Sequence, residues 1–428
     1  MVCGRNLTAG ITLALGLTLG AGCGGSQPTA AGPVPAGSGA PTAVATAATA
    51  GSLTPAAHVP SAGTTKGVPE EPCTLGNEAE CLAKCDAGGA ESCARLSNIY
   101  FLVKDNPAEQ ARAFAAAKKG CDGGSSAGCN NLGFAYEIGL GTAKDFDQAR
   151  ALYESACKQG NSASYNNLGT MYEEGHGVPK DAAKAVDLYR QACVLHNPDG
   201  CYNLGYAYAQ ATGVAADLKQ AQASYAMACD DNHGGACNNL AYLYADGRGA
   251  PKDEAKAAEL FGKACGLGSA NSCFQLGSSL LDGTPAVPKD EAKALALGRK
   301  SCDGGSAKGC RLLGFMLENG RGTAKNAKAA VELYQKACAA GDAVGCNNLG
   351  VSYRLGSGVG HDDRKAAELF TLGCDKGSAN ACTELGTLYF TGVGVTKDAA
   401  KARDLFRKAC SAGQKDGCDK LKVAGGKP

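Results

Sequence analysis

The sequence has no tryptophan and no excess of charge of either sign. Lys and Arg together number 42 and Asp and Glu 41, which leaves a formal net charge of +1. A protein that binds nucleic acid by neutralising phosphates needs clustered Lys and Arg, so the composition excludes a nucleic-acid partner. Aromatic residues make up 6% of the chain, against 61 glycines and 23 cysteines. Because a reducing cytosol rarely tolerates so many cysteines in one chain, these numbers exclude an ordinary cytosolic enzyme.

Long hydrophobic runs are absent as well, apart from a short one near the N-terminus. Residues 1–22 join a cationic start at Arg5 to an apolar run too short to span a membrane, which predicts a signal peptide. The run ends at Gly20-Ala21-Gly22-Cys23, which resembles the lipobox of bacterial lipoproteins although Gly20 stands where Leu is preferred. The resemblance implies a lipid on Cys23. It also favours the outer membrane, facing the periplasm or the cell surface, because no Asp follows the cysteine. A secreted protein with an incidental Cys23 is the alternative.

The next segment lacks charge altogether as far as Lys66. Residues 23–72 are mostly Ala, Gly, Pro, Thr and Ser, a composition that cannot bury enough apolar surface to fold. We therefore expect a lipidated N-terminus followed by a disordered tether that holds the folded part away from the membrane.

The rest of the chain repeats every 36 residues. One step of 37 residues has a visible cause, because the loop at residues 283–290 is one residue longer than its counterpart in the preceding repeat. This periodicity predicts an N-terminal half-repeat at 73–92, nine repeats at 93–410, and a C-terminal cap and tail at 411–428. The step is marked by Cys85, Cys121, Cys157, Cys193, Cys229, Cys265, Cys302, Cys338, Cys374 and Cys410.

Each repeat predicts two helices. In the first helix, Leu132 and Tyr136 share one face by their i, i+4 spacing. A glycine follows that leucine in most repeats, which indicates a close helix crossing because glycine otherwise weakens a helix. The second helix is expected to begin at an N-capping residue such as Asp145, followed by a buried stripe at Ala149 and Leu152.

This helix-turn-helix unit resembles the Sel-one-like repeat of the tetratricopeptide superfamily. The resemblance covers about residues 73–423 and rests on recurring blocks such as 347–353 (NNLGVSY) and 401–410 (KARDLFRKAC). It implies an all-α fold, a right-handed superhelical α/α solenoid whose concave surface comes mainly from the first helices.

Paired cysteines join the end of each second helix to the start of the next first helix. Their eight-residue spacing allows two Cβ atoms to come within bonding distance. Structural zinc sites favour sets of four cysteines two to four residues apart, so disulfides are favoured over metal, with Cys81 and Cys85 as a weak exception. The pattern resembles the cysteine-rich Hcp-type subfamily of these repeats. The expected pairs are Cys73 with Cys81, Cys85 with Cys93, Cys121 with Cys129, Cys193 with Cys201, Cys229 with Cys237, Cys265 with Cys273, Cys302 with Cys310, Cys338 with Cys346, Cys374 with Cys382, and Cys410 with Cys418.

One cysteine has no partner at this spacing. Tyr165 stands where the partner of Cys157 would be. A free thiol there can serve an intermolecular bridge or a redox contact, or it can be a buried thiol without a role, which we favour. The sequence predicts one free thiol per oxidised, processed chain.

A row of polar residues precedes the first-helix Leu-Gly and predicts a binding groove. In tetratricopeptide relatives this position faces the groove and hydrogen-bonds a peptide, and amides suit a peptide backbone or a sugar. The alternative is that these side chains support helix starts or bridge adjacent helices. The predicted groove residues are Asn131, Asn167, Asn203, Asn239, Gln275 and Asn348, with Tyr206 and Tyr242 for apolar contact.

Enzyme chemistry has little support. The Hcp-type resemblance implies penicillin binding with weak β-lactam hydrolysis, and Ser155 and Lys158 have the Ser-x-x-Lys spacing of serine enzymes. The companion motifs are missing and the position is expected to be exposed, so we interpret the match as coincidence. The five histidines are scattered, and neither a metal nor a cofactor is expected.

Together these features predict an envelope-tethered repeat scaffold. Its groove would bind an envelope protein, a peptide or a peptidoglycan fragment, and its N-terminal lipid would contact the membrane. Weak β-lactam hydrolysis is the alternative from the enzyme class.

Overall fold

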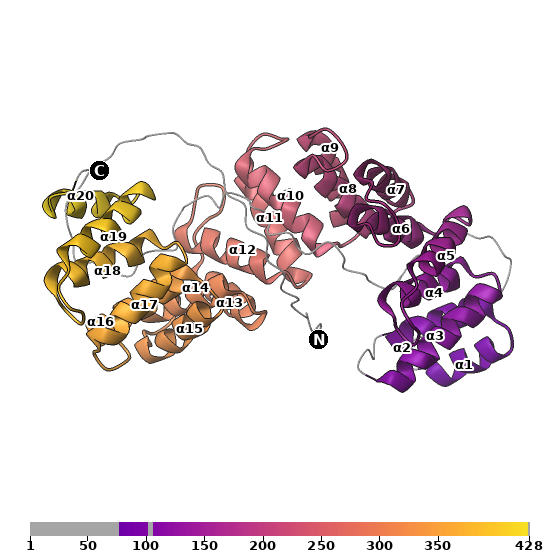
Figure 1. Ribbon diagram of the computed structural model, residues 1–428, viewed down its shortest axis with the longest axis horizontal. Coiled ribbons are helices and arrows are strands. Elements are labelled where there is room, and N and C mark those ends of the chain that lie inside the picture. Colours follow the sequence, from indigo (N-terminus) through magenta and orange to yellow (C-terminus); the bar gives the residue numbers. More distant parts are fainter. Residues whose placement is uncertain (1–76, 102–105, 427–428) are drawn as a thin grey trace. The chain divides into compact units, whose positions relative to one another are not determined.

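A computed structural model describes residues 77–101 and 106–426, in which the chain forms twenty helices and no strand (Figure 1). The predicted signal peptide, Cys23, the tether and Cys73 lie outside the described residues. The helices are α1 (Glu78–Asp86), α2 (Ala90–Phe101), α3 (Pro107–Asp122), α4 (Ser126–Ile138), α5 (Phe146–Lys158), α6 (Ser162–Glu174), α7 (Ala182–Val194), α8 (Pro198–Gln210), α9 (Leu218–Asp230), α10 (Gly234–Asp246), α11 (Glu254–Gly266), α12 (Ala270–Asp282), α13 (Glu291–Asp303), α14 (Ala307–Asn319), α15 (Ala327–Ala339), α16 (Ala343–Leu355), α17 (Asp363–Asp375), α18 (Ala379–Thr391), α19 (Ala399–Ser411) and α20 (Lys415–Val423).

The helices pack as repeated antiparallel pairs. Each helix contacts its neighbours in the chain, and several even-numbered helices also contact the next even-numbered helix, as in α2 with α4 and α16 with α18. Such stacking makes each repeat depend on its immediate neighbours. The chain is therefore an all-α solenoid of about nine disulfide-bonded repeats, as the periodicity predicts.

The second helix of each repeat begins where the sequence predicts. The Asp145 side chain accepts a hydrogen bond from the Gln148 backbone N–H at 3.0 Å, which satisfies one of the free donors at the start of α5. Equivalent caps are formed by Asp181, Asp217, Asp253, Asp290, Asn326, Asp362 and Asp398.

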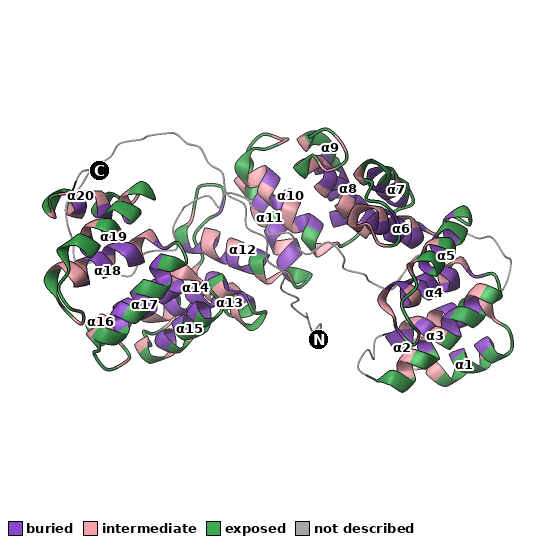
Figure 2. Ribbon diagram, viewed as in Figure 1, coloured by how far each residue is buried: buried purple, intermediate pink, exposed green. Residues whose placement is uncertain are grey.

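The glycine of the first helix lies against a buried aromatic ring of the second. A Cβ atom on Gly169 would stand 2.7 Å from the Tyr189 ring, and one on Gly350 would stand equally close to Phe370. These rings are almost fully buried, and the buried residues follow the sides of the helices that face each other (Figure 2). The close crossing predicted from the glycines is therefore confirmed, and its cause is the ring.

Within the described residues, nine disulfides join consecutive repeats, and all nine are pairs that the spacing predicts. Their Cα atoms lie 4.3 to 4.7 Å from each other. Cys73 is outside the described residues, so its pairing with Cys81 stays a prediction. Among the described cysteines Cys157 alone is free, and it is buried. The bonded pairs are Cys85 with Cys93, Cys121 with Cys129, Cys193 with Cys201, Cys229 with Cys237, Cys265 with Cys273, Cys302 with Cys310, Cys338 with Cys346, Cys374 with Cys382, and Cys410 with Cys418.

Candidate binding face

Five predicted groove residues lie together on consecutive first helices. Asn203 and Tyr206 belong to α8, Asn239 and Tyr242 to α10, and Gln275 to α12, and each is partly exposed. Their spacing of three residues within a helix places each pair on one helical side. We call this set the even-helix face.

Three other predicted groove residues are buried instead. Asn131 is fully buried, and its amide donates to the Ala94 carbonyl at 3.0 Å and to Ser97 Oγ at 2.8 Å. Asn167 is 4% exposed and donates to Asn130 Oδ1 at 3.1 Å, and Asn348 is 2% exposed. The Asn131 and Asn167 amides join adjacent first helices, which is the bridging interpretation, and the partly exposed Asn203 does the same, since its Nδ2 donates to Asn166 Oδ1 at 2.8 Å. None of the three buried asparagines is accessible to a ligand in this structure.

Two of the buried asparagines, Asn167 and Asn348, accompany buried tyrosines of the second helices. Asn131 is the exception, because Ala117 stands at the equivalent position. Burial and the neighbouring Glu137 raise the pKa of Tyr153 well above its ordinary value, while the adjacent Asn167 amide acts in the opposite direction. A buried phenol requires a polar partner, so the amide has a structural reason to be there. Tyrosines at 153, 189, 225 and 334 are followed fourteen residues later by Asn167, Asn203, Asn239 and Asn348, whereas Phe261, Gly298, Phe370 and Phe406 are followed by Gln275, Leu312, Glu384 and Lys420.

This pairing was readable in the sequence by comparing the repeats with one another. Leu312 fits it as well, because its side chain lies 3.7 Å from the Cβ position of Gly298 and so occupies space left by the missing ring. The pairing divides the row of amides into those that serve as the polar partner of a buried phenol and those that have no such phenol beside them. Gln275 belongs to the second group, since Phe261 has no hydroxyl group.

Gln275, which has no buried phenol to partner, joins two helices of the even-helix face. Gln275 Nε2 donates to the Tyr242 hydroxyl at 2.5 Å, and the Tyr242 ring packs edge-on against Phe261 with centroids 5.1 Å apart. Burial raises the pKa of Tyr242 above its ordinary value. The phenol therefore stays protonated at neutral pH, and the face offers phenol and amide groups that both donate and accept hydrogen bonds.

A second buried polar cluster was not foreseen from the sequence. Tyr153 Oη donates to Glu137 Oε2 at 2.8 Å, and His176 Nδ1 lies 3.5 Å from Glu137 Oε1. The His176 ring stacks on Phe146 with centroids 5.1 Å apart. Because the Glu137 side chain is only 2% exposed, burial raises its pKa above the ordinary value. The same Tyr-to-Glu bond recurs from Tyr189 to Glu173 and from Tyr334 to Glu318, and a Glu sixteen residues before a Tyr is the signal that sequence reasoning missed.

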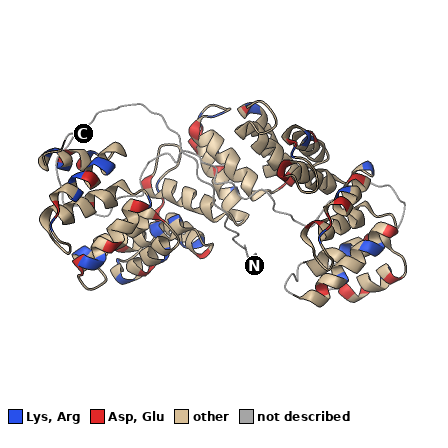
Figure 3. Cartoon of the chain, viewed as in Figure 1, with Lys and Arg blue, Asp and Glu red and all other residues tan. Residues whose placement is uncertain are grey.

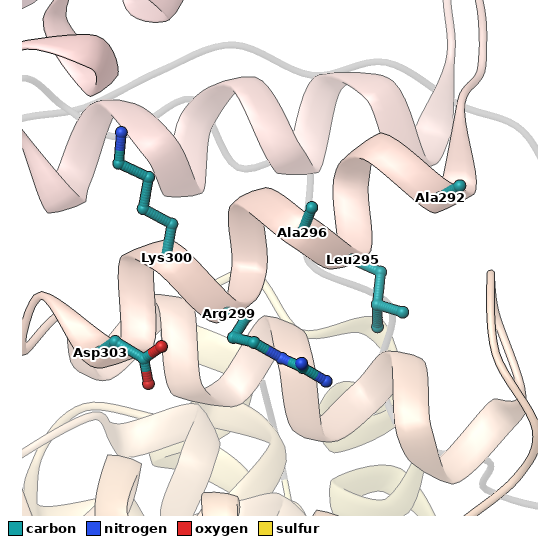
Figure 4. A pocket seen from close by; sticks show the side chains of 6 residues that line it. All are labelled: Ala292, Leu295, Ala296, Arg299, Lys300 and Asp303. Carbon is teal, nitrogen blue, oxygen red and sulfur yellow. The ribbon is translucent and has the colours of Figure 1, made fainter.

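The serine-enzyme candidates gain no support from their surroundings. Ser155 and Lys158 are both exposed on α5. A surface hollow lies along one side of α13, lined by Ala292, Leu295, Ala296, Arg299, Lys300 and Asp303. Figure 4 shows the Arg299 and Lys300 side chains extending away from each other, so they do not converge on a common ligand.

The described residues contain neither a metal-binding cluster nor a helix suited to a membrane. Within residues 77–101 and 106–426, no three His, Cys, Asp or Glu side chains are placed to hold a metal ion. Over the same part of the chain, no helix combines the length and the apolar character that crossing a membrane requires.

Comparison with known proteins identifies the family. The Sel1 repeat model matches residues 126–161, 162–194, 198–233, 235–269, 270–306, 307–342, 343–378 and 379–414. The chain therefore belongs to the Sel1 repeat family, whose members are typically non-enzymatic scaffolds that bind other proteins. No match was found among curated protein sequences.

Solved structures with the same repeat are similar to this chain. A Sel1 repeat protein from Oxalobacter formigenes is 23% identical, with a TM-score of 0.53 over 57% of this chain and 96% of its own. A protective antigen of uropathogenic Escherichia coli with an SLR fold is 25% identical, with a TM-score of 0.38 over 82% of this chain and 90% of its own. The cysteine rich protein B of Helicobacter pylori is 33% identical, with a TM-score of 0.26 over 31% of this chain and 93% of its own.

Proposed function

We propose that this protein is an exported, envelope-tethered scaffold that binds an envelope protein, a peptide or a cell-wall fragment through its even-helix face. The observation that carries the proposal is the run of partly exposed amides and phenols on α8, α10 and α12. Surfaces of this kind combine ring contacts with hydrogen bonds to a polar chain.

Export is supported by the cysteines. Nine disulfides persist only where the environment is oxidising. The lipid on Cys23 and the tether at residues 23–72 belong to the proposal, because they rest on the lipobox resemblance and on composition.

The structure changes which residues should be tested. Asn131 and Asn167 bond neighbouring helices, so replacing them would weaken packing whether or not a ligand binds. Tyr206 and Tyr242 are better choices. Tyr208 and Tyr244 are a matched control, because they lie on the same helices and their hydroxyls accept from Arg190 and Gln222 of the preceding second helices. Tyr242 packs instead on Phe261 of the following second helix and bonds Gln275.

The test is capture of partners from an envelope extract by the oxidised chain. We expect Tyr206→Ala with Tyr242→Ala to lose specific partners that wild type and Tyr208→Ala with Tyr244→Ala retain. Thermal unfolding of each variant shows whether it is folded. If both double variants capture the same partners as wild type, the even-helix face is not the binding surface.

A further inference from the structure

Basic residues are segregated by helix in the N-terminal half of the solenoid. The five even-numbered helices α4, α6, α8, α10 and α12 contain no Lys or Arg, whereas α3, α5, α7, α9 and α11 contain ten. The charges on those even-numbered helices are Glu137, Glu173, Glu174, Asp199, Asp246 and Asp282. In Figure 3, α8, α10 and α12 are correspondingly almost free of blue.

The segregation stops further along the chain. Lys308 and Arg311 belong to α14 and Arg354 to α16, so the absence of bases is a property of one region and not of the repeat. The same five helices also carry eight of the fifteen tyrosines of the chain. Ring faces attract ammonium and guanidinium groups, so the tyrosines and acids that these helices expose favour the same kind of ligand.

The acids at the end of this face are accessible. Asp246 and Asp282 are exposed at the C-terminal ends of α10 and α12. Asp246 lies close enough to Tyr242 to influence its ionisation. Arg321 is the basic group that acts on Asp282, and it is itself bonded to Glu291.

The protein already binds its own cations in this way. Lys184 Nζ lies 4.0 Å from the centroid of the Tyr172 ring and donates to its hydroxyl at 2.6 Å. Lys401 does the same at Tyr389, with 4.2 Å to the ring centroid. Tyr172 and Tyr389 occupy the repeat position of Tyr208 and Tyr244 and not that of Tyr206 and Tyr242. They show that a tyrosine of a first helix in this solenoid can hold a basic side chain by its ring and its hydroxyl.

We infer that the even-helix face of α8, α10 and α12 binds a cationic partner, an extended peptide rich in Arg and Lys. The inference rests on the proposed function and narrows it by charge complementarity. An extended chain fits because partly exposed amides recur on successive helices. The Asn203 and Gln275 amides donate to Asn166 and Tyr242, and their side-chain oxygens can accept from a peptide backbone. Because the net charge of the chain is only +1, the molecule as a whole does not attract a cation, and the attraction that we infer is local to this face.

The test uses the oxidised chain and three labelled twelve-residue peptides in which Ser alternates with Arg, Gln or Glu. We expect fluorescence anisotropy at low salt to show binding of the Arg peptide and no binding of the Glu peptide. Asp246→Asn with Asp282→Asn should weaken binding of the Arg peptide about tenfold. The loss should shrink at high ionic strength, where exposed charges are screened.

The matched control changes the same charge on second helices. Asp187→Asn with Asp404→Asn removes two exposed carboxylates from α7 and α19 and should leave the affinity within about twofold of wild type. An equal loss in both double variants, or equal binding of the Arg and Gln peptides, would overturn the inference. In the latter case the scaffold function survives if envelope partners are still captured, so the two proposals fail separately.

Discussion

At the scale of single residues, burial decides which side chains are reactive. Cys157 has no disulfide partner and is 7% exposed. Burial, assisted by Glu154, raises the pKa of its thiol to about 12. The thiolate is the nucleophilic form, so this cysteine is poorly suited to redox exchange in the folded protein.

This burial leads to a labelling prediction. In the oxidised chain at about pH 8, iodoacetamide should modify Cys157 at least roughly tenfold more slowly than a free cysteine, and denaturation should remove the difference. Mass spectrometry of the modified chain measures the rate, and Cys157→Ser should show no labelling at that site. Fast labelling of the folded protein would contradict the prediction.

The buried carboxylate of Glu137 should make stability depend on pH. Its pKa is raised in the folded state, so the folded protein binds this proton more tightly than the unfolded chain does. The stabilising effect of the proton is present below the ordinary Glu pKa of 4.5 and is lost as pH rises through the folded pKa.

Glu137→Gln tests this dependence. The glutamine oxygen can still accept from Tyr153, but the buried charge is removed. We expect the variant to have a higher melting temperature than wild type at about pH 7, and the difference to shrink towards about pH 4. A constant difference across this range would show that the carboxylate is not the titrating group.

At the scale of helices, the glycine of each first helix tests the packing model. Gly169→Ala places a Cβ 2.7 Å from the Tyr189 ring, and we expect it to lower the free energy of unfolding by about 1–3 kcal/mol. Gly262→Ala is the matched control in α11, where the nearest atom is Leu276 Cδ2 at 3.6 Å. It should raise stability by about 0.5–1 kcal/mol, since alanine favours a helix. Equal effects in chemical denaturation would show that the crossing tolerates a side chain.

Comparison of the helices also explains why the sequence predicted the helix starts correctly but did not predict which of the amides are buried. Asp145 and its equivalents form their caps within three residues, so their role depends on local sequence. Asn131 and Asn203 occupy the same repeat position, yet one is buried and the other partly exposed. That difference depends on partners more than thirty positions away, such as Ser97 for Asn131.

At the scale of the whole molecule, one of the described junctions between repeats lacks the disulfide that the other described junctions have. Disulfides close the turns from α7 to α8 and from α9 to α10, among others. The turn from α5 to α6 has no disulfide, because Tyr165 stands where the partner of Cys157 would be. Closing an eight-residue loop contributes about 2.5 kcal/mol in the chain-entropy model. Since repeats depend on their neighbours, this junction should open most readily.

Hydrogen exchange measures that opening. We expect amides of residues 159–165 to exchange faster than those of residues 195–201 in the oxidised chain. Tyr165→Cys, which restores the cysteine pair, should slow exchange at the first segment, and reduction should speed it at the second. Equal protection of both segments in the oxidised wild type would contradict the prediction.

The sequence by itself determined the repeat through its 36-residue period, and it determined the starts of the second helices and nine disulfide pairs because each of these depends on residues within about ten positions of one another. Only the tertiary structure decided which of the repeated amides are exposed, that Glu137 and His176 meet, and that Gly169 lies against Tyr189. Those outcomes depend on side chains brought together by the stacking of helices. Burial and electrostatic environment are therefore properties of the assembled solenoid, whereas periodicity and capping are properties of the chain.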